Sequence, residues 1–172
     1  MVKNYSWDEY FMTLAYLVSM KSKDPSTRVG AVIVGEDKEI RGTGYNGLPR
    51  GVHDKLERYT DKVYKYLSLN HAEENAILHC ARIGIATKNC SIYTLWIPCS
   101  RCAKSIIQAG IKEVVCDARF PGNTESNQHE NWQESIKISK ELLLEAGVKI
   151  REYKGTFINI KGLYQSKEFD IV

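Results

Sequence analysis

Two short motifs in the chain carry side chains capable of chemistry. The first is H-A-E at 71–73, and the second is P-C-S-R-C at 98–102. Cys99 and Cys102 are three residues apart at the expected start of a helix, so both sulfurs can converge on one ion. The N–H groups at such a helix start lower thiol pKa values and favour the metal-binding thiolate. Thiolates together with an imidazole are a ligand set that suits zinc.

His71, Cys99 and Cys102 would provide three ligands and leave the fourth tetrahedral position to water, which is typical of a catalytic zinc site. Bound zinc lowers the pKa of that water from about 15.7 toward about 7. Glu73 lies two residues from His71. It can therefore sit beside the metal and take the proton without being a ligand. Acid–base catalysis by one positioned carboxylate contributes typically about 10²–10⁴-fold.

A C-x-x-C pair by itself also occurs in structural zinc knuckles and in redox pairs. A structural site needs a fourth ligand. None of the other candidates belongs to a second paired motif; they are His53, His79, His129, Cys80, Cys90 and Cys116. A redox pair leaves His71 and Glu73 without a role. We therefore predict one catalytic zinc per chain, with a non-enzymatic, zinc-stabilised binding module as the alternative.

Composition limits the classes of protein that this chain can be. It has 172 residues, of which 43% are hydrophobic and 26% charged, and its net charge is +3. These values predict a single globular domain over 1–172 with a short tail at 154–172. The odd number of cysteines, five, excludes complete intramolecular pairing. We expect no signal peptide, no membrane partner and a cytoplasmic location, where cysteines stay reduced.

The two motifs must be positioned by regular elements. The capping-box spacing at 6–9 predicts a helix beginning near Trp7. A hairpin of strands follows at 29–34 and 39–44, then a loop at 45–51 and a charged, partly helical stretch at 54–69. After it we predict helix 71–83, strand 91–95, helix 101–109, strand 113–116, a polar loop at 120–129, helix 132–146 and a last strand at 148–153. This order predicts an α/β fold with a mixed five-stranded sheet, antiparallel first and parallel later.

H-x-E followed by P-C-x-x-C is the signature of zinc nucleobase deaminases. The chain resembles the cytidine deaminase-like superfamily and, more narrowly, the deoxycytidylate (dCMP) deaminases, from about Trp7 to Tyr153. The matching segments are D-P-S-T-R-V-G-A-V-I-V at 24–34, G-Y-N-G-L-P-R-G at 44–51, H-A-E-E-N-A-I at 71–77, P-C-S-R-C-A-K at 98–104 and I-Q-A-G-I at 107–111. The loop around Asn46 is the part that is typical of dCMP deaminases.

The resemblance implies a three-layer α/β/α sandwich and hydrolytic deamination of dCMP to dUMP, which supplies dUMP for thymidylate synthesis. Whether dCTP is also a substrate stays open. His71, Cys99 and Cys102 would hold zinc, and Glu73 would shuttle protons. The backbone N–H of Ala72 would bind the pyrimidine carbonyl.

Further substrate and effector residues are carried over from the same resemblance. Asn46 would contact the deoxyribose, and Pro98 belongs to the second zinc segment beside the substrate. Arg28 is a candidate phosphate contact, with a solvated arginine as the alternative. Arg119 could reach a phosphate and Phe120 could stack on a pyrimidine. The candidates for an effector site are Gly47, Arg50 and Asp54.

Members of the family are commonly homohexamers, activated by dCTP with Mg²⁺ and inhibited by dTTP. We accordingly expect a homo-oligomer, with a hexamer as the first choice. A polynucleotide deaminase acting on tRNA adenosine or single-stranded DNA cytosine shares the zinc motifs and stays an alternative. Such enzymes need a basic groove. A net charge of +3 gives that alternative little support, so no stable nucleic-acid partner is expected.

Overall fold

A mixed sheet of five strands forms the centre of the structure. The computed structural model describes residues 4–123, 130–164 and 167–170. The strands are β1 (Gly30–Val34), β2 (Ile40–Tyr45), β3 (Ser91–Thr94), β4 (Glu113–Asp117) and β5 (Lys149–Tyr153), in the order β2-β1-β3-β4-β5. β1 pairs antiparallel with β2 and β3, whereas β4 runs parallel to β3 and β5. The predicted mixed sheet is therefore confirmed.

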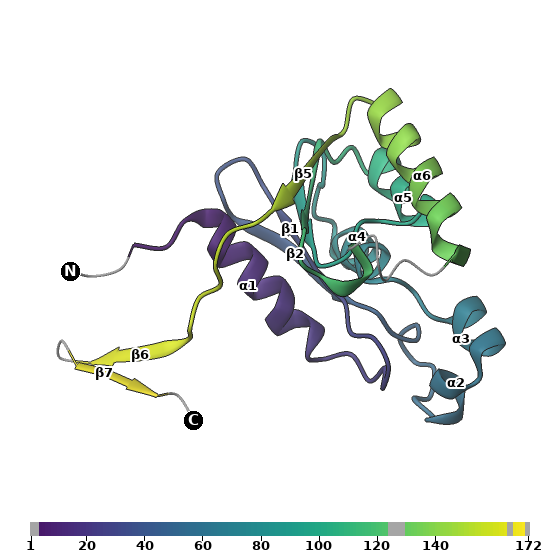
Figure 1. Cartoon of the computed structure of the whole chain (residues 1–172), viewed down its shortest axis with the longest axis horizontal. Coiled ribbons are helices and arrows are strands. Elements are labelled where there is room, and N and C mark those ends of the chain that lie inside the picture. The colour runs from purple at the N-terminus through teal and green to yellow at the C-terminus, as the bar shows by residue number, and fades with distance from the viewer. Residues whose placement is uncertain (1–3, 124–129, 165–166, 171–172) are drawn as a thin grey trace.

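Helices cover both faces of this sheet (Figure 1). α1 (Trp7–Ser19) lies on one face, and α4 (Ala72–Ile83), α5 (Ser100–Gln108) and α6 (Glu130–Glu145) lie on the other. α1 packs so closely that a Cβ on Gly30 would lie 2.0 Å from the Ala15 carbonyl oxygen. β1 is buried along its whole length, as expected for a strand covered on both faces. These layers form the expected α/β/α sandwich.

Segments outside the three layers are short. The predicted partly helical stretch contains α2 (Glu57–Thr60) and α3 (Lys62–Ser68), and Pro121–Asn123 forms a single 3₁₀ turn in the predicted polar loop. Positions 124–129 of that loop lie outside the described residues. The expectation that 148–153 is the last strand is wrong, because β6 (Lys161–Tyr164) and β7 (Lys167–Asp170) form a separate antiparallel hairpin. Strands of four residues are too short to show a clear period in the sequence.

Helix ends follow the local signals in the sequence. Ser6 and Glu9 form the predicted capping box of α1, with Ser6 Oγ accepting from the Glu9 N–H at 3.2 Å. Gly84 ends α4 in the left-handed conformation, with φ of 74°. Within the described residues, no helix combines the length and the apolar character that a membrane span requires.

The helix that carries His71 and Glu73 lies in direct backbone contact with β2. A Cβ on Gly44 would lie 2.2 Å from the Ala76 nitrogen and 2.3 Å from the Ala72 carbonyl oxygen. Real Cβ atoms do not approach backbone atoms so closely. Glycine at position 44 is therefore what allows α4 to lie at this depth on the sheet.

We predict that Gly44→Ala pushes α4 outward and lowers the free energy of unfolding by about 1–3 kcal/mol, the usual effect of overpacking. Thermal denaturation measures this change. Gly47→Ala is the matched control, because its Cβ would meet only the Tyr45 ring at 3.6 Å. Equal melting temperatures for Gly44→Ala and the wild type would show that α4 is not held by this contact.

Candidate metal centre and its cavity

The three predicted metal ligands converge in the structure. His71 directly precedes α4, and Cys99 directly precedes α5, so the starts of the two helices meet at the site. His71 Nδ1 lies 3.4 Å from Cys99 Sγ and 3.3 Å from Cys102 Sγ. Among the described residues, this is the only group of at least three His, Cys, Asp or Glu side chains whose donor atoms lie close enough together to hold a metal ion.

The donor set fits zinc in both geometry and charge. Zn–S bonds of about 2.3 Å and Zn–N bonds of about 2.0–2.1 Å at tetrahedral angles place N and S about 3.6 Å apart. The observed N–S separations of 3.3 and 3.4 Å are close to this value. A hydrogen bond from the Cys102 thiol, together with His71, lowers the pKa of Cys99 to about 4. Cys99 is therefore already a thiolate at neutral pH, the form that binds metal.

Glu73 stands beside this group without belonging to it. Its Oε2 lies 3.6 Å from Cys102 Sγ, and its Oε1 accepts a hydrogen bond from Thr94 Oγ1 at 3.3 Å. The side chain is 4% exposed, and burial raises the pKa of its carboxyl. A buried carboxyl with a raised pKa takes up a proton more readily than one in water. This is the property that a proton shuttle needs.

A salt bridge holds the two motif helices together. Arg101 on α5 donates to Glu74 Oε1 on α4 at 2.6 Å, and Glu74 Oε2 accepts from the His71 N–H at 3.3 Å. Glu74 therefore links both ligand segments. The neighbouring carboxylate of Glu73 has other partners, Thr94 and Cys102. The remaining cysteines, Cys80, Cys90 and Cys116, are buried and free, as expected for small apolar side chains.

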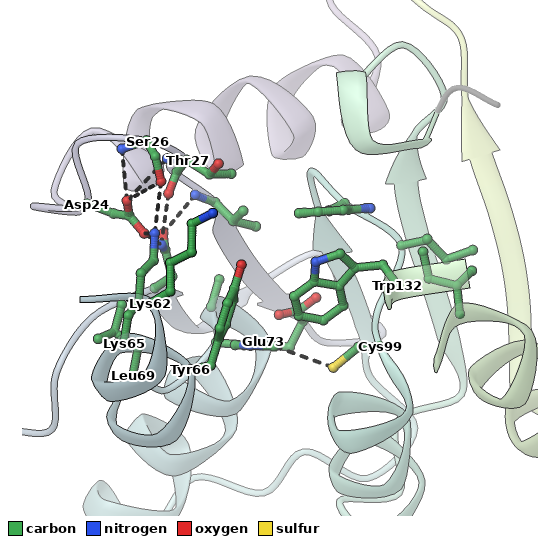
Figure 2. Close-up of a pocket in the computed structure, with 17 residues that line it drawn as sticks. Asp24, Ser26, Thr27, Lys62, Lys65, Tyr66, Leu69, Glu73, Cys99 and Trp132 are labelled. Atoms are coloured by element: carbon green, nitrogen blue, oxygen red, sulfur yellow. Dashed lines mark hydrogen bonds and ion pairs between the residues drawn. The ribbon is translucent and has the colours of Figure 1, made fainter. Parts of the chain in front are cut away.

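A cavity of about 330 Å³ opens at the metal site. Its walls include Trp132 on α6 and Tyr66 on α3, whose rings lie 6.1 Å apart, and Trp132 is also 6.0 Å from the His71 ring. Figure 2 shows Trp132 beside Glu73 and Cys99, with Tyr66 on the side toward α3. Ser135 Oγ accepts from the Ser100 N–H at 3.1 Å and so ties α6 to the start of α5. This contact fixes the wall that α6 provides.

The predicted substrate residues divide into two groups. Asn46 and Ala72 line the cavity. The Asn46 amide donates to Thr27 O at 2.9 Å and to Asp24 Oδ2 at 3.3 Å, and it accepts from the Val29 N–H at 2.8 Å. In this structure Asn46 therefore holds the turn at 24–27 against β1.

The other predicted substrate residues lie outside the described lining of the cavity. Pro98 is buried, and Arg28 is exposed, with its Nε 3.4 Å from the Asp24 carbonyl oxygen. Arg119 pairs with Asp117 at 3.4 Å. Phe120 packs near Trp96, with ring centroids 5.8 Å apart. A phosphate role for either arginine and a stacking role for Phe120 receive no support from these positions.

The predicted effector residues divide between a second cavity and a separate ion pair. Arg50 lines a second cavity of about 280 Å³, together with His79 and Arg82. Gly47 forms a backbone bridge with Asn70, which also lines this second cavity. Asp54 pairs with Lys23 at 2.7 Å and accepts from the Tyr59 hydroxyl at 2.6 Å.

Several cavity residues escaped the sequence prediction. Lys62, Lys65 and Tyr66 line the cavity from α3, and Trp132 lines it from α6. The spacing of Lys62, Lys65 and Tyr66 places them on one side of a helix. That spacing is a usable signal, but only once 62–68 is known to be helical. Trp132 gives no comparable signal, since its role depends on where α6 packs.

Comparison with known proteins assigns the family. The model of the cytidine and deoxycytidylate deaminase zinc-binding region matches residues 5–118, more than half of the chain. The chain belongs to this deaminase family. The matched region is a zinc-binding one, and it contains all three converging donors.

Individual relatives of this deaminase family agree. The chain is 47% identical over 116 residues to deoxycytidylate deaminase from Mus musculus and 46% identical over 116 residues to that from Homo sapiens. Each match covers 63% of this chain and 63% of the relative, so the chain spans less than two thirds of their length. An uncharacterized deaminase from Aliivibrio fischeri is 41% identical over 144 residues, which are 84% of this chain and 91% of that protein.

A solved structure from the same family shares the fold. It is the dCMP deaminase of the cyanophage S-TIM5 in complex with dCMP and dUMP, which matches with a TM-score of 0.67 and 26% identity. The match covers 88% of this chain and 99% of that chain. The expected cytidine deaminase-like fold is therefore confirmed.

We predict that the purified protein carries about one zinc per chain, as a three-ligand site requires, and that Cys99→Ala or Cys102→Ala removes most of it. Elemental analysis of the dialysed proteins measures the content. Cys116→Ala is the control, because Cys116 is equally buried but lies outside the donor group. Full zinc retention by Cys102→Ala would exclude Cys102 as a ligand.

Proposed function

We propose that this protein deaminates dCMP hydrolytically to dUMP, with one zinc held by His71, Cys99 and Cys102. The observation that carries the proposal is a buried carboxylate, Glu73, beside the donor group at the base of a cavity large enough for a small ligand. The names of the mouse and human relatives and the dCMP and dUMP bound by the cyanophage enzyme support this substrate.

The chain's own residues account for the proton steps. Bound zinc supplies an activated water for attack on C4 of the cytosine. Glu73 takes a proton from this water and delivers it to N3 of the ring. It then carries a second proton from the added hydroxyl to the amine, which leaves as ammonia. Its bond from Thr94 Oγ1 holds one carboxylate oxygen and leaves Oε2 on the side of Cys102.

Ala72 is the first residue of α4, and the N–H groups of a first helical turn have no partner within the helix. Ala72 also lines the cavity. We propose that its N–H binds the pyrimidine carbonyl and so orients the ring toward Glu73. Trp132 borders the same end of the cavity, with its ring 6.0 Å from that of His71. A flat ring of this kind excludes water and favours an aromatic base.

We predict that Glu73→Gln lowers the rate of dUMP formation by about 10²–10⁴-fold, because it removes the proton carrier, while zinc content and melting temperature stay unchanged. Production of dUMP and ammonia from dCMP measures the rate. Glu36→Gln is the control, because Glu36 pairs with Lys112 at 2.7 Å and is not among the residues that line the cavity.

Each other outcome favours a different function. Absence of turnover with dCMP, dCTP and deoxycytidine, with zinc and dCTP–Mg²⁺ present, would exclude the proposed activity. Turnover only within tRNA or single-stranded DNA would identify a polynucleotide deaminase. Zinc-dependent folding without turnover of any of these would identify a binding module.

We also propose that the protein assembles as a homo-oligomer, with a hexamer as the first choice, and responds to dCTP–Mg²⁺ as activator and dTTP as inhibitor. The second cavity, which Arg50, His79 and Arg82 line, supports an anionic effector.

We predict that Arg50→Gln moves half-maximal activation to a higher dCTP concentration, because it removes a cation near the phosphates. Activity titrations with dCTP–Mg²⁺ measure the shift, and light scattering measures the assembly. An unchanged dCTP response would exclude Arg50 from the effector site.

A further inference from the structure

The cavity has a second end, away from the metal group. It is formed by the turn that contains Asp24, Ser26 and Thr27, and by α3, which contributes Lys62 and Lys65. Figure 2 shows both lysines reaching from α3 toward this turn, while Glu73 and Cys99 lie at the opposite end. One end of the cavity therefore carries the candidate reaction centre, and the other carries amines and hydroxyls.

One of the two lysines is already neutralised. Lys65 Nζ lies 2.7 Å from Asp24 Oδ2, and their side chains are 16% and 1% exposed. Asp24 Oδ1 also accepts from the N–H and the hydroxyl of Ser26, both at 2.9 Å. Burial raises the pKa of Asp24, but Lys65 and these hydrogen bonds outweigh it and hold the pKa below its usual value. Asp24 and Lys65 thus form a closed ion pair with no net charge.

Lys62 is different. It lies three residues before Lys65, on the same side of α3, and it lines the same cavity. Within the described part of the chain, no salt bridge joins Lys62 to a carboxylate. This end of the cavity therefore has a net positive charge from one free ammonium group, next to the turn at Ser26 and Thr27.

We infer that Lys62, which lines the cavity beside the Ser26–Thr27 turn, binds the phosphate of a nucleoside 5′-monophosphate whose base lies at the metal end. This inference rests on the proposed deamination and identifies what selects a phosphorylated substrate. The N–H groups of Ser26 and Thr27 and the Ser26 hydroxyl donate to Asp24. The ammonium of Lys62 is therefore the group at this end that suits a phosphate dianion. The two arginines expected to hold the phosphate, Arg28 and Arg119, are exposed and lie outside the described lining of the cavity.

The test compares Lys62→Gln with the wild type on dCMP and on deoxycytidine, which lacks the phosphate. We expect kcat/KM for dCMP to fall about 10- to 100-fold, the usual loss for a hydrogen bond to a charged group. The loss should fall mainly on KM. The value for deoxycytidine should stay unchanged, and Lys62→Arg should restore most of the activity on dCMP.

Lys21→Gln is the matched control, because Lys21 is exposed and is not among the residues that line this cavity. Calorimetric binding of dUMP and deoxyuridine to the zinc-loaded protein tests the same contact without turnover. We expect Lys62→Gln to weaken dUMP binding alone. If the wild type turns over no substrate but Lys62→Gln still weakens dUMP binding alone, the proposed activity fails while the phosphate contact stands.

Two results would overturn the inference itself. Unchanged kcat/KM for both dCMP and deoxycytidine in Lys62→Gln would identify Lys62 as a solvated surface lysine. An equal loss on both substrates, with a lower melting temperature, would identify a structural role.

Discussion

The close approach of α4 to β2 is the contact on which the metal centre depends. Gly44 leaves no room for a Cβ between the strand and the backbone of α4. The depth of α4 on the sheet sets the position of His71 at its start, and the Glu74–Arg101 salt bridge then relates this start to α5 and its two cysteines. A shift of α4 would move His71 and Glu73 together relative to Cys99 and Cys102, which lie at the start of α5.

The meeting of two helix starts also bears on the buried negative charge at the metal centre. Cys99 is a thiolate at neutral pH, whereas burial raises the pKa of Glu73 and the hydrogen bond with Cys99 raises the pKa of Cys102. Cys99 is therefore the buried anion of this group. Both α4 and α5 begin at this group, and the start of a helix favours anions. A divalent cation would neutralise the remaining charge. The donor group at the two helix starts therefore suits a divalent cation.

The cavity joins two environments of opposite character. At the metal end, Glu73 is held by Thr94, close to aromatic rings. At the other end, the Asp24–Lys65 pair stabilises a polar turn, and Asn46 fastens this turn to β1. A ligand that spans both ends needs an aromatic group on one side and an anionic group on the other. A pyrimidine nucleotide has this polarity, which a pyrimidine base alone lacks.

The sequence by itself determined the three donors, the carboxylate beside them, and the order of the helices and strands along the chain as far as residue 153. It could do so because His71 and Glu73 are neighbours in the chain, Cys99 and Cys102 share one helix start, and strand and helix periods are local properties. Only the tertiary structure decided which further side chains reach the cavity. Trp132 reaches it because α6 packs on α5, and Lys62 lies on α3, which the Lys65–Asp24 ion pair joins to the turn at 24–27. Arg119, in contrast, pairs with Asp117 and is not among the lining residues. Such placements depend on contacts between residues far apart in the chain, which no local pattern encodes.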